Sequence, residues 1–466
     1  MSRAPVIGAG STPTDREVEV AGVPSPGVSG VPRLPSGPGP HTIIVLAKSP
    51  VSGRVKTRLS PTFTPAEAAA LAAAAIRDTF DTVVRVGPVR MVVAWDGPVV
   101  PWIPAAARVV RQRGGGLDER LEHVFADVLG PSGDASGGLT DVIPDRPTLL
   151  VGMDTPQLRP EHLTADWRGA DAVLGLSPDG GYWAIGFRRH VPGAIRGVEM
   201  SSERTGAQQL ARLRSLGLSV TLLPPLLDVD DPADARIVAG EAPDSRFGRL
   251  HRRLVSTPCA PTTLFDVAMS GVEVRVRTAA GVAWSLDVQS WLTMSDADEL
   301  LVARCEPPVL DIGCGPGRFV EALAVRGLPA LGVDVSQAAV ASTSGRGVGA
   351  LLRNVHDPLP GEGRWGTVLL ADGNIGIGGD PLALLRRCRE LVRPGAMALV
   401  ETASDDDADG CTTVSLHEPH GRMSTPLPWA VVGARRLIEL AAEAGFVAVE
   451  DWRVGDRCFV ALRHAG

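Results

Sequence analysis

Residues 309–318 read VLDIGCGPGR, an apolar run that leads into a loop with glycine at alternate positions, and a helix-like segment, FVEALAV, follows. Gly313, Gly315 and Gly317 would weaken a strand or a helix, because glycine loses more backbone freedom on folding than any other residue. A strand, a glycine-rich loop and a helix in this order let the backbone approach a nucleotide closely. The stretch therefore predicts an α/β domain with a ligand at the end of a strand.

The residues around this loop distinguish two kinds of nucleotide site. A dinucleotide fingerprint G-x-G-x-x-G/A that starts at Gly313 requires a small residue at position 318, where this sequence has Arg318. Asp334 ends the next strand-like run, ALGVD, and a carboxylate there can accept hydrogen bonds from two ribose hydroxyls. The pattern weakens the nicotinamide interpretation and favours another ligand that contains ribose.

With these motifs, the segment 300–465 resembles the class I S-adenosylmethionine-dependent methyltransferases. The resemblance rests on the acid two residues before the first glycine, the three glycines, the acid after the next strand, and the later run LVRPGAMALVE. It implies S-adenosylmethionine as cofactor, with Asp311 beside its amino-acid end and Asn354 near its adenine. The cofactor-binding residues that it implies are Asp311, Gly313, Gly315, Gly317, Asp334 and Asn354.

The stretch LLADGNIGIGGDP is expected to end the fourth strand of this domain. By the same resemblance, Asp372 and Asn374 face the methyl group of the cofactor, and Asp372 is a candidate catalytic residue. The paired prolines and aromatic residue that would hold a flipped base are absent, which disfavours methylation of a nucleobase. For Cys314, a buried small residue is favoured over a reactive thiol, because no basic residue is adjacent in sequence.

Another α/β series precedes this domain. It begins at Thr42 with TIIVLAK, a β-branched run typical of a buried parallel strand, and a helix is expected from Thr64-Pro65 with Glu67 in its first turn. Strand-like and helix-like segments then alternate up to Leu254. Such alternation predicts a mostly parallel sheet covered by helices, with ligands where the strands end.

The chain of 466 residues is therefore expected to contain two tandem Rossmann-like α/β domains. Residues 1–40 are rich in Pro and Gly and are predicted to form a disordered tail. The first domain is placed at 41–254 and the methyltransferase-like domain at 264–466. Residues 255–263 contain STPCAPTT and are predicted to be a linker.

The loop after the first strand of the N-terminal domain, AKSPVSGRVKTRLSP, is strongly basic. Several cations at the carboxyl end of a strand suit a nucleoside di- or triphosphate, because charge-assisted hydrogen bonds to phosphate are strong. The spacing differs from G-x-x-x-x-G-K-[ST], so the loop is not an ATPase phosphate loop. A solvated basic loop is the alternative. The candidate nucleotide-binding residues are Lys48, Arg54, Lys56 and Arg58.

Acidic residues end two other strands of the same domain. Asp154 lies in VGMDTP, and LLDVDDP contains Asp228, Asp230 and Asp231. Carboxylates from two strand ends opposite a basic loop suit a metal-bridged pyrophosphate, because Mg²⁺ prefers oxygen ligands. An Asp before a turn is also a common helix N-cap, which is the alternative for Asp154.

The motifs AKSPVSGRVKTRL, RGGGLDERL, VGMDTPQL, SPDGGYWAIGF and LLDVDDPAD follow one another within residues 42–250. In this order they resemble a GT-A-type glycosyltransferase family of unknown function, DUF2064, also described as arsenosugar-biosynthesis-like. They are also similar to the phospholactate guanylyltransferases of deazaflavin cofactor synthesis, which share the basic first loop. The N-terminal domain is therefore expected to have the GT-A-like nucleotide-diphospho-sugar transferase fold.

This second resemblance implies roles for individual residues. Lys48, Lys56 and Arg58 would bind phosphate, while Asp154 and Asp230 would bind Mg²⁺ or Mn²⁺, with Asp154 also catalytic. The loop PDGGYW would lie on the acceptor side, with Asp179 as a catalytic residue and with Tyr182 either in the pocket or in the core.

Composition limits the remaining function classes. The net charge of −7 gives no basic stripe for nucleic acid, and the six scattered cysteines without C-x-x-C indicate a reducing compartment rather than a zinc or disulfide framework. The first residues do not resemble a secretory signal, and the longest apolar run, 66–76, is too short to span a membrane. We expect a cytoplasmic protein with small-molecule substrates, and the oligomeric state is left open.

The two resemblances together predict a bifunctional transferase. The N-terminal domain would transfer a glycosyl group from a nucleotide-activated donor, and the C-terminal domain would transfer a methyl group from S-adenosylmethionine. One alternative makes the N-terminal domain a nucleotidyltransferase that attacks an α-phosphate. Another makes the chain a regulatory protein that binds ligands without turnover.

Overall fold

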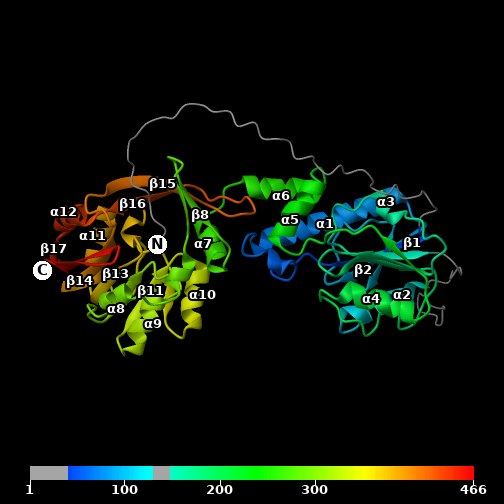
Figure 1. Cartoon of the computed structure of the whole chain (residues 1–466), viewed down its shortest axis with the longest axis horizontal. Coiled ribbons are helices and arrows are strands. Elements are labelled where there is room, and N and C mark those ends of the chain that lie inside the picture. The colour runs from blue at the N-terminus through cyan, green and yellow to red at the C-terminus, as the bar shows by residue number, and fades with distance from the viewer. Residues whose placement is uncertain (1–39, 130–146) are drawn as a thin grey trace, which may run out of the picture. The chain divides into compact units, whose positions relative to one another are not determined.

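The computed structural model describes residues 40–129 and 147–466. Contacts divide these residues into two compact units, and the division falls between Leu254 and Val255 (Figure 1). The expected linker at 255–263 contains the end of α6 (Arg246–Ser256) and the start of α7 (Pro261–Met269). The expected tail at 1–40 lies outside the described residues except for its last one.

The N-terminal unit is built on a seven-stranded sheet with the order β3-β2-β1-β4-β6-β5-β7. Strand β6 is antiparallel to both of its neighbours, and the other pairs are parallel. Because the strand order reverses between β1 and β4, their carboxyl ends flank the crevice where open α/β sheets bind ligands. The strands are β1 (Thr42–Lys48), β2 (Arg90–Asp96), β3 (Ala107–Arg111), β4 (Thr148–Val151), β5 (Ala172–Leu176), β6 (Tyr182–Phe187) and β7 (Val220–Leu223).

Helices cover both faces of this sheet, as Figure 1 shows. Ile43 and Val45 of β1 pack in one apolar cluster with α1, whereas Ile44 packs in a second cluster with α2 and α4. This alternation follows from the two-residue period of a strand. Helix α1 starts as expected, because Thr64 and Glu67 form a capping box. The helices are η1 (Thr57–Leu59), α1 (Pro65–Val86), α2 (Leu117–Leu129), α3 (Pro160–Leu163), α4 (Thr205–Ser215), α5 (Pro232–Glu241) and α6.

The C-terminal unit contains a seven-stranded sheet with the order β12-β11-β10-β13-β14-β18-β17. Strand β18 is antiparallel to β14 and β17, and the other pairs are parallel. The order reverses between β10 and β13, so both units confirm the predicted Rossmann-like class. The strands are β10 (Val309–Ile312), β11 (Ala330–Asp334), β12 (Ala350–Leu352), β13 (Trp365–Leu370), β14 (Val392–Thr402), β17 (Phe446–Val454) and β18 (Arg457–His464).

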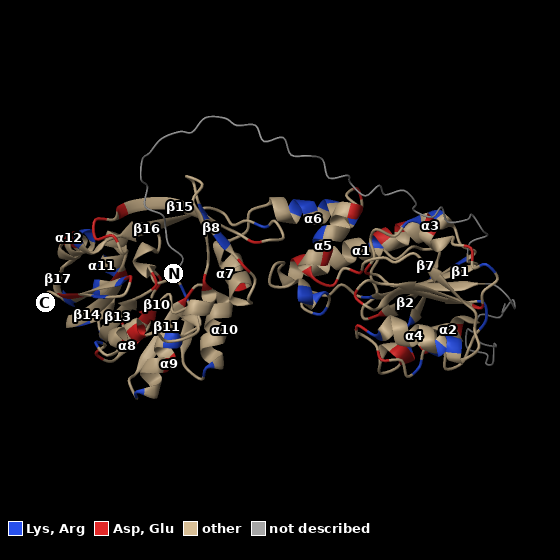
Figure 2. Ribbon diagram, in the orientation of Figure 1, with Lys and Arg blue, Asp and Glu red and all other residues tan. Residues whose placement is uncertain are grey.

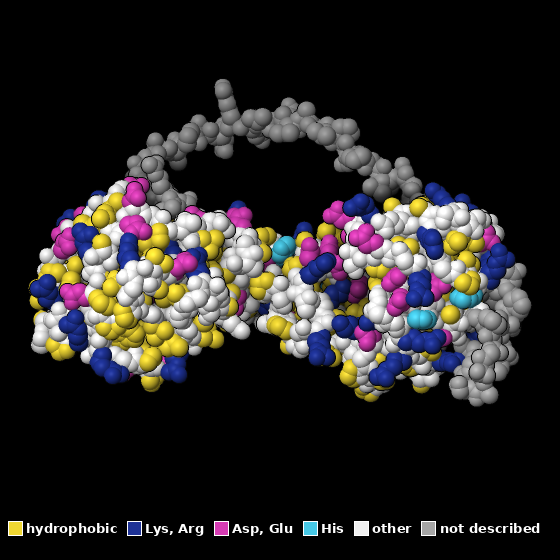
Figure 3. Space-filling model, turned by 90° about the horizontal axis from the view of Figure 1, so that it is seen from below, with side chains coloured by type: hydrophobic (Ala, Val, Ile, Leu, Met, Phe, Trp, Pro, Cys, Tyr) yellow, Lys and Arg dark blue, Asp and Glu magenta, His cyan; other side chains and the backbone are white. Residues whose placement is uncertain are grey.

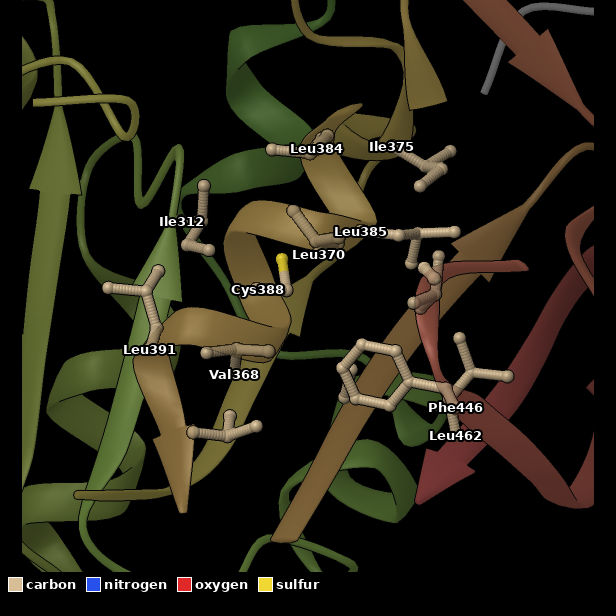
Figure 4. Packing of buried hydrophobic residues seen from close by; sticks show 14 of the residues in the cluster. Ile312, Val368, Leu370, Ile375, Leu384, Leu385, Cys388, Leu391, Phe446 and Leu462 are labelled. Atoms are coloured by element: carbon tan, nitrogen blue, oxygen red, sulfur yellow. The ribbon is translucent and has the colours of Figure 1, made fainter. Parts of the chain in front are cut away.

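The core of this unit also has two faces. Ile312 of β10 packs with Val368 and Leu370 of β13 and with Cys388 of α11, as Figure 4 shows. Phe319 of α9 belongs to the cluster on the opposite face, with α8. The helices are η2 (Val288–Trp291), α8 (Asp296–Val302), α9 (Arg318–Val325), α10 (Gln337–Gly345), η3 (Asn374–Gly376), α11 (Pro381–Leu391) and α12 (Ala434–Ala444).

A four-stranded antiparallel sheet, β16-β15-β8-β9, was not predicted from the sequence. It packs on α7 through Leu264 and Leu416 among others. Trp429 of β16 forms an isolated bridge with Ile377, directly after η3. The small sheet therefore lies against the loop that follows β13. Its strands are β8 (Arg275–Thr278), β9 (Ala283–Ser285), β15 (Asp409–His417) and β16 (Leu427–Val432).

The Pro-Gly pair of LVRPGAMALVE lies inside β14, which begins at Val392, and Gly395 has a φ of 77°. In the described part of the chain, no helix is both long and apolar enough to cross a membrane.

Candidate functional site

The glycine-rich loop of the C-terminal unit connects β10 to α9. Gly313, Gly315 and Gly317 all have positive φ, at 70°, 51° and 87°. A Cβ on Gly313 would lie 2.6 Å from the amide nitrogen of Asn374, and one on Gly317 would lie 2.5 Å from Oγ1 of Thr343. Around the corresponding Cβ position of Gly315 nothing lies within 4 Å. The loop therefore needs glycine for its conformation and leaves open space at Gly315.

Asp334 lies at the carboxyl end of β11, beside this open space. Its Oδ2 accepts a hydrogen bond from the backbone N–H of Gly315 at 2.9 Å, and its Oδ1 accepts one from Ser336 at 2.8 Å. Burial raises the pKa of Asp334, while these backbone hydrogen bonds act to lower it. The carboxylate is thus already oriented at the position where the sequence predicted a partner for ribose.

Asp266 of α7 supports the same corner and was not found from the sequence. Its Oδ1 accepts hydrogen bonds from the hydroxyl of Ser336 at 2.6 Å and from the backbone N–H of Ala338 at 3.1 Å. Asp266 precedes the glycine loop by many residues and belongs to no recognisable motif. Only the packing of α7 against α10 brings it there.

Asp311 is buried on β10, with 1% of its surface exposed. Among the described residues, its Oδ2 has no hydrogen-bond partner. Burial raises its pKa to about 7, Arg318 counteracts this shift, and Asp372 and Asp334 reinforce it. A buried carboxylate without a partner, among other acids, favours a cationic group as its ligand.

Asp372, the candidate catalytic residue, is paired with the buried Arg318. Nη2 of Arg318 lies 2.8 and 2.7 Å from its two carboxylate oxygens. Asn374, two residues later, donates its side-chain N–H to the carbonyl oxygens of Ile312 and Gly313 at 2.8 and 3.0 Å. Both side chains therefore connect the loop after β13 to the segments around the glycine loop.

Asn354 lies on the loop after β12. Its side chain is exposed, and Oδ1 accepts a hydrogen bond from the backbone N–H of His356 at 3.0 Å. Strand β12 pairs with β11, with Leu352 opposite Asp334, so Asn354 lies at the same edge of the sheet as the glycine loop. Figure 2 shows acidic and basic segments close together around β10 and α9, near this edge.

In the N-terminal unit, Lys56 connects three strand ends. It has a left-handed backbone with φ of 49°, and its side chain is 7% exposed. Its Nζ lies 2.8 Å from Oδ1 of Asp154 and 3.4 Å from Oδ1 of Asp230, and it donates to the carbonyl of Val229. Burial disfavours its charge, but Asp154, Asp230 and Asp228 outweigh this effect and raise its pKa.

The other three cations of the basic loop are exposed. Nη1 of Arg58 lies 3.3 Å from Oδ2 of Asp230. Neither Lys48 nor Arg54 makes a side-chain ion pair with any described residue, so both are available to an anion. Figure 3 shows acidic and basic side chains mixed on one face of this unit.

Asp228 is a further acid of this site, which the sequence indicated without assigning it a role. Its Oδ1 is buried and has no hydrogen-bond partner among the described residues. Burial raises its pKa to about 7, Asp154 and Asp179 add to this shift, and Lys56 opposes it. Asp231, in contrast, caps α5 and accepts hydrogen bonds from the N–H groups of Ala233 and Asp234.

The loop PDGGYW, which was expected on the acceptor side, is tightly packed. Asp179 accepts a hydrogen bond from the N–H of Gly181 at 2.9 Å, and a Cβ on Gly180 would lie 1.9 Å from the carbonyl oxygen of Glu203. Tyr182 packs against the core cluster around β5 and α4. Its aromatic ring therefore belongs to the core, the second of the two expected positions.

The predicted metal pair is only partly reproduced. Asp154 and Asp230 do converge, but each of them contacts Lys56. Within residues 40–129 and 147–466, no three His, Cys, Asp or Glu side chains are arranged to hold a metal ion. Cys314 is buried, and burial raises the pKa of its thiol, which agrees with the expected structural role.

Two family models match the chain, one within each unit. Residues 295–451 match the family model described as a methyltransferase domain. The C-terminal unit contains a methyltransferase domain. Residues 70–202 match the model of uncharacterised proteins conserved in bacteria, DUF2064. Both predicted resemblances are confirmed, and the chain is a transferase. We call residues 255–466 the methyltransferase unit.

Solved structures match each unit separately. A protein described as a nucleotide-diphospho-sugar transferase from Desulfovibrio desulfuricans G20 is 23% identical, with 46% of this chain and 94% of that chain covered and a TM-score of 0.40. A S-adenosylmethionine-dependent methyltransferase from Bacteroides fragilis is 21% identical, with coverages of 43% and 94% and a TM-score of 0.39. The 1,6-didemethyltoxoflavin-N1-methyltransferase of Burkholderia thailandensis is 19% identical, with coverages of 45% and 93% and a TM-score of 0.30. No curated protein matches the chain.

Proposed function

We propose that the methyltransferase unit transfers the methyl group of S-adenosylmethionine to a small-molecule acceptor. The observation that carries this proposal is the orientation of Asp334. Its carboxylate is held at 2.9 Å from the N–H of Gly315, at the edge where the strand order reverses and beside open space. A ribose placed in this space can donate both hydroxyls to the carboxylate.

The charges of the site suit the rest of the cofactor. S-adenosylmethionine carries a positive sulfonium and a positive amino group, and its sulfonium supplies the methyl group. Asp311 has the unpartnered, buried oxygen that a buried ammonium group would satisfy. Catalysis in this unit then consists mainly of alignment of the acceptor with the methyl group, which requires fixed loops more than a strong base.

For the N-terminal unit, we propose binding of a nucleotide-activated donor and transfer of its glycosyl group. Lys48 and Arg54 are exposed at the crevice between β1 and β4, where they can contact phosphate oxygens. The unpartnered Oδ1 of Asp228, beside Asp154, fits a divalent cation. Asp154 and Asp228 or Asp230 would hold this ion, and it would offset the charge of the leaving diphosphate.

The products separate this reaction from its closest alternative. The purified full chain is incubated with nucleotide sugars and Mg²⁺, and the released phosphate compounds are identified. Glycosyl transfer releases a nucleoside diphosphate, whereas a nucleotidyltransferase that attacks an α-phosphate releases pyrophosphate. Tight binding of nucleotides without any turnover would instead favour a regulatory protein that binds ligands.

Binding of S-adenosyl-L-homocysteine tests the methyltransferase unit without knowledge of the acceptor. Isothermal titration calorimetry of the full chain is expected to show one site. Absence of heat at millimolar ligand, with circular dichroism that shows a folded protein, would contradict the proposed cofactor.

A further inference from the structure

Five charged side chains form a closed ion network next to the glycine loop of the methyltransferase unit. They come from four different secondary-structure elements and from the loop after β13. Arg318 directly follows the glycine pattern that identified the cofactor site. The other four side chains lie outside that pattern. The members are Asp298 of α8, Arg318 of α9, Asp372, Glu401 of β14 and Arg457 of β18.

Arg457 pairs with all three acids of this ion network, Glu401, Asp298 and Asp372. Its Nε lies 2.8 Å from Oε1 of Glu401 and its Nη2 lies 2.7 Å from Oε2. This is a bidentate ion pair, which a lysine cannot form. Its Nη1 lies 2.7 Å from Oδ1 of Asp298. Asp298 in turn lies 3.2 Å from Nε of Arg318, which also holds Asp372.

Stability alone does not explain such an arrangement. The side chains of Arg318, Asp298 and Glu401 are 4%, 2% and 2% exposed. Removal of charges from water is costly, and apolar side chains of similar volume often stabilise a protein as well or better. A buried ion network is therefore best explained by the geometry that it imposes on the parts of the chain that it joins.

The geometry imposed here is that of the turn at Asp372. The backbone N–H of Asp372 donates to Oε2 of Glu401 at 2.6 Å, and Asp372 has a left-handed φ of 53°. This conformation is costly for a residue other than glycine and persists only where its surroundings enforce it. Two residues later, Asn374 holds the carbonyl groups of Ile312 and Gly313. Hydrogen bonds of the turn therefore connect Glu401 to the glycine loop.

We propose that Arg457 is a positioning residue for S-adenosylmethionine. Among the described residues it makes no hydrogen bond or ion pair with the glycine loop, but it holds the Asp372 turn, directly through an Nη2–Oδ1 pair at 3.5 Å and indirectly through Glu401, and Asn374 links this turn to the loop. The inference rests on the proposed cofactor of this unit. It assigns a role in ligand binding to the first residue of β18, far in sequence from every motif of the site.

The test measures affinity for S-adenosyl-L-homocysteine by calorimetry on the full chain, at a temperature at which circular dichroism shows each variant folded. Arg457→Met is expected to bind about tenfold more weakly than the wild type. Arg457→Lys is expected to bind with an affinity between those of the wild type and Arg457→Met, because an ammonium group keeps the charge but cannot form the bidentate ion pair. Arg304→Met is the matched control, because Arg304 pairs with Glu450 of the adjacent strand β17 and stacks on Trp452 outside the ion network.

A double-mutant cycle distinguishes positioning from a general loss of stability. Asn374→Ala removes the link to the glycine loop, so it should weaken binding, and Arg457→Met should then add little further loss. Fully additive effects would overturn the proposal, as would an equal loss of affinity in Arg304→Met. If the Arg457→Met variant does not fold, the affinity of the Arg457→Lys variant is measured instead. An affinity of that variant within about twofold of the wild type overturns the proposal.

The proposed cofactor and the proposed role of Arg457 can be overturned separately. A folded wild-type protein that does not bind S-adenosyl-L-homocysteine overturns the proposed cofactor and, with it, the role of Arg457. A wild-type protein that binds, together with a folded Arg457→Met variant of unchanged affinity, overturns only the role of Arg457.

Discussion

Nζ of Lys56 lies 2.8 Å from Oδ1 of Asp154, and this contact joins the loops that follow β1 and β4. These two strands lie side by side at the point where the strand order of the N-terminal sheet reverses. The lysine also lies near Asp230 and Asp228, so one buried cation offsets the mutual repulsion of several acids. The basic loop and the acidic strand ends are therefore one site rather than two.

Lys56→Met should destabilise the N-terminal unit by about 2 kcal/mol, because it leaves Asp154 without its cation. Urea unfolding followed by tryptophan fluorescence measures the change. Lys48→Met is the matched control, since Lys48 is exposed and makes no described ion pair, so its free energy of unfolding should stay at the wild-type value. Equal stability of the two variants would show that the Lys56 pairing contributes nothing measurable.

Nucleotide binding to the N-terminal unit should depend on a divalent cation. Chelation with EDTA is expected to lower the affinity for nucleoside diphosphates, and Mg²⁺ should restore it, because the ion bridges carboxylates and phosphate oxygens. Asp154→Asn should abolish transfer by this unit while S-adenosyl-L-homocysteine binding stays intact. Nucleotide binding that is insensitive to EDTA would mean that the acids serve only as partners of Lys56.

Asp334→Ala should weaken binding of S-adenosylmethionine by roughly 1.5–3 kcal/mol, since the ribose hydroxyls lose a charged acceptor. Calorimetry on the full chain gives the dissociation constant. Asp451→Ala is a suitable control, because Asp451 is an exposed acid on β17 away from the glycine loop. An Asp334→Ala variant that binds as tightly as this control would place the ribose elsewhere.

The stability of the methyltransferase unit should fall as the pH rises from about 4 to about 7. Burial raises the pKa of Asp311 to about 7, against an ordinary value of 3.8, so in this range the folded state holds a proton that the unfolded state has lost. The unfolding free energy should therefore decrease by at most about 1.4 kcal/mol per pH unit from this group. Urea titrations across this range measure the slope.

Asp311→Asn should remove the contribution of Asp311 to the pH dependence of the unfolding free energy, because the amide does not titrate in this range. The slope between about pH 4 and pH 7 should then be smaller than in the wild type. The charged groups that act on the pKa of Asp311 are Arg318, Asp372, Asp334 and Asp298, and all four remain in the variant, as do the nearby thiols of Cys305 and Cys314. A variant with the same slope as the wild type would show that Asp311 is ionised throughout.

Local patterns were sufficient for the fold class and for the outline of both sites. The start of the helix at Thr64-Pro65, the apolar strand at Thr42 and the glycine loop were each recognisable from a few adjacent residues. In contrast, the small sheet of β8, β9, β15 and β16 was missed, because β8, β9 and β15 have mixed polar and apolar residues without a continuous apolar run and are partly exposed. Its pairing depends on contacts between distant segments.

The sequence by itself determined which strand ends would carry the acids, cations and glycines, because that follows from local periodicity and chain order. Only the tertiary structure decided what those side chains do, as two residues illustrate. Asp372 looked like a catalytic acid, yet Arg318 and Glu401 hold it in a strained turn. Arg457 had no signal at all, because a buried charge acquires its role from partners that folding brings together from separate elements.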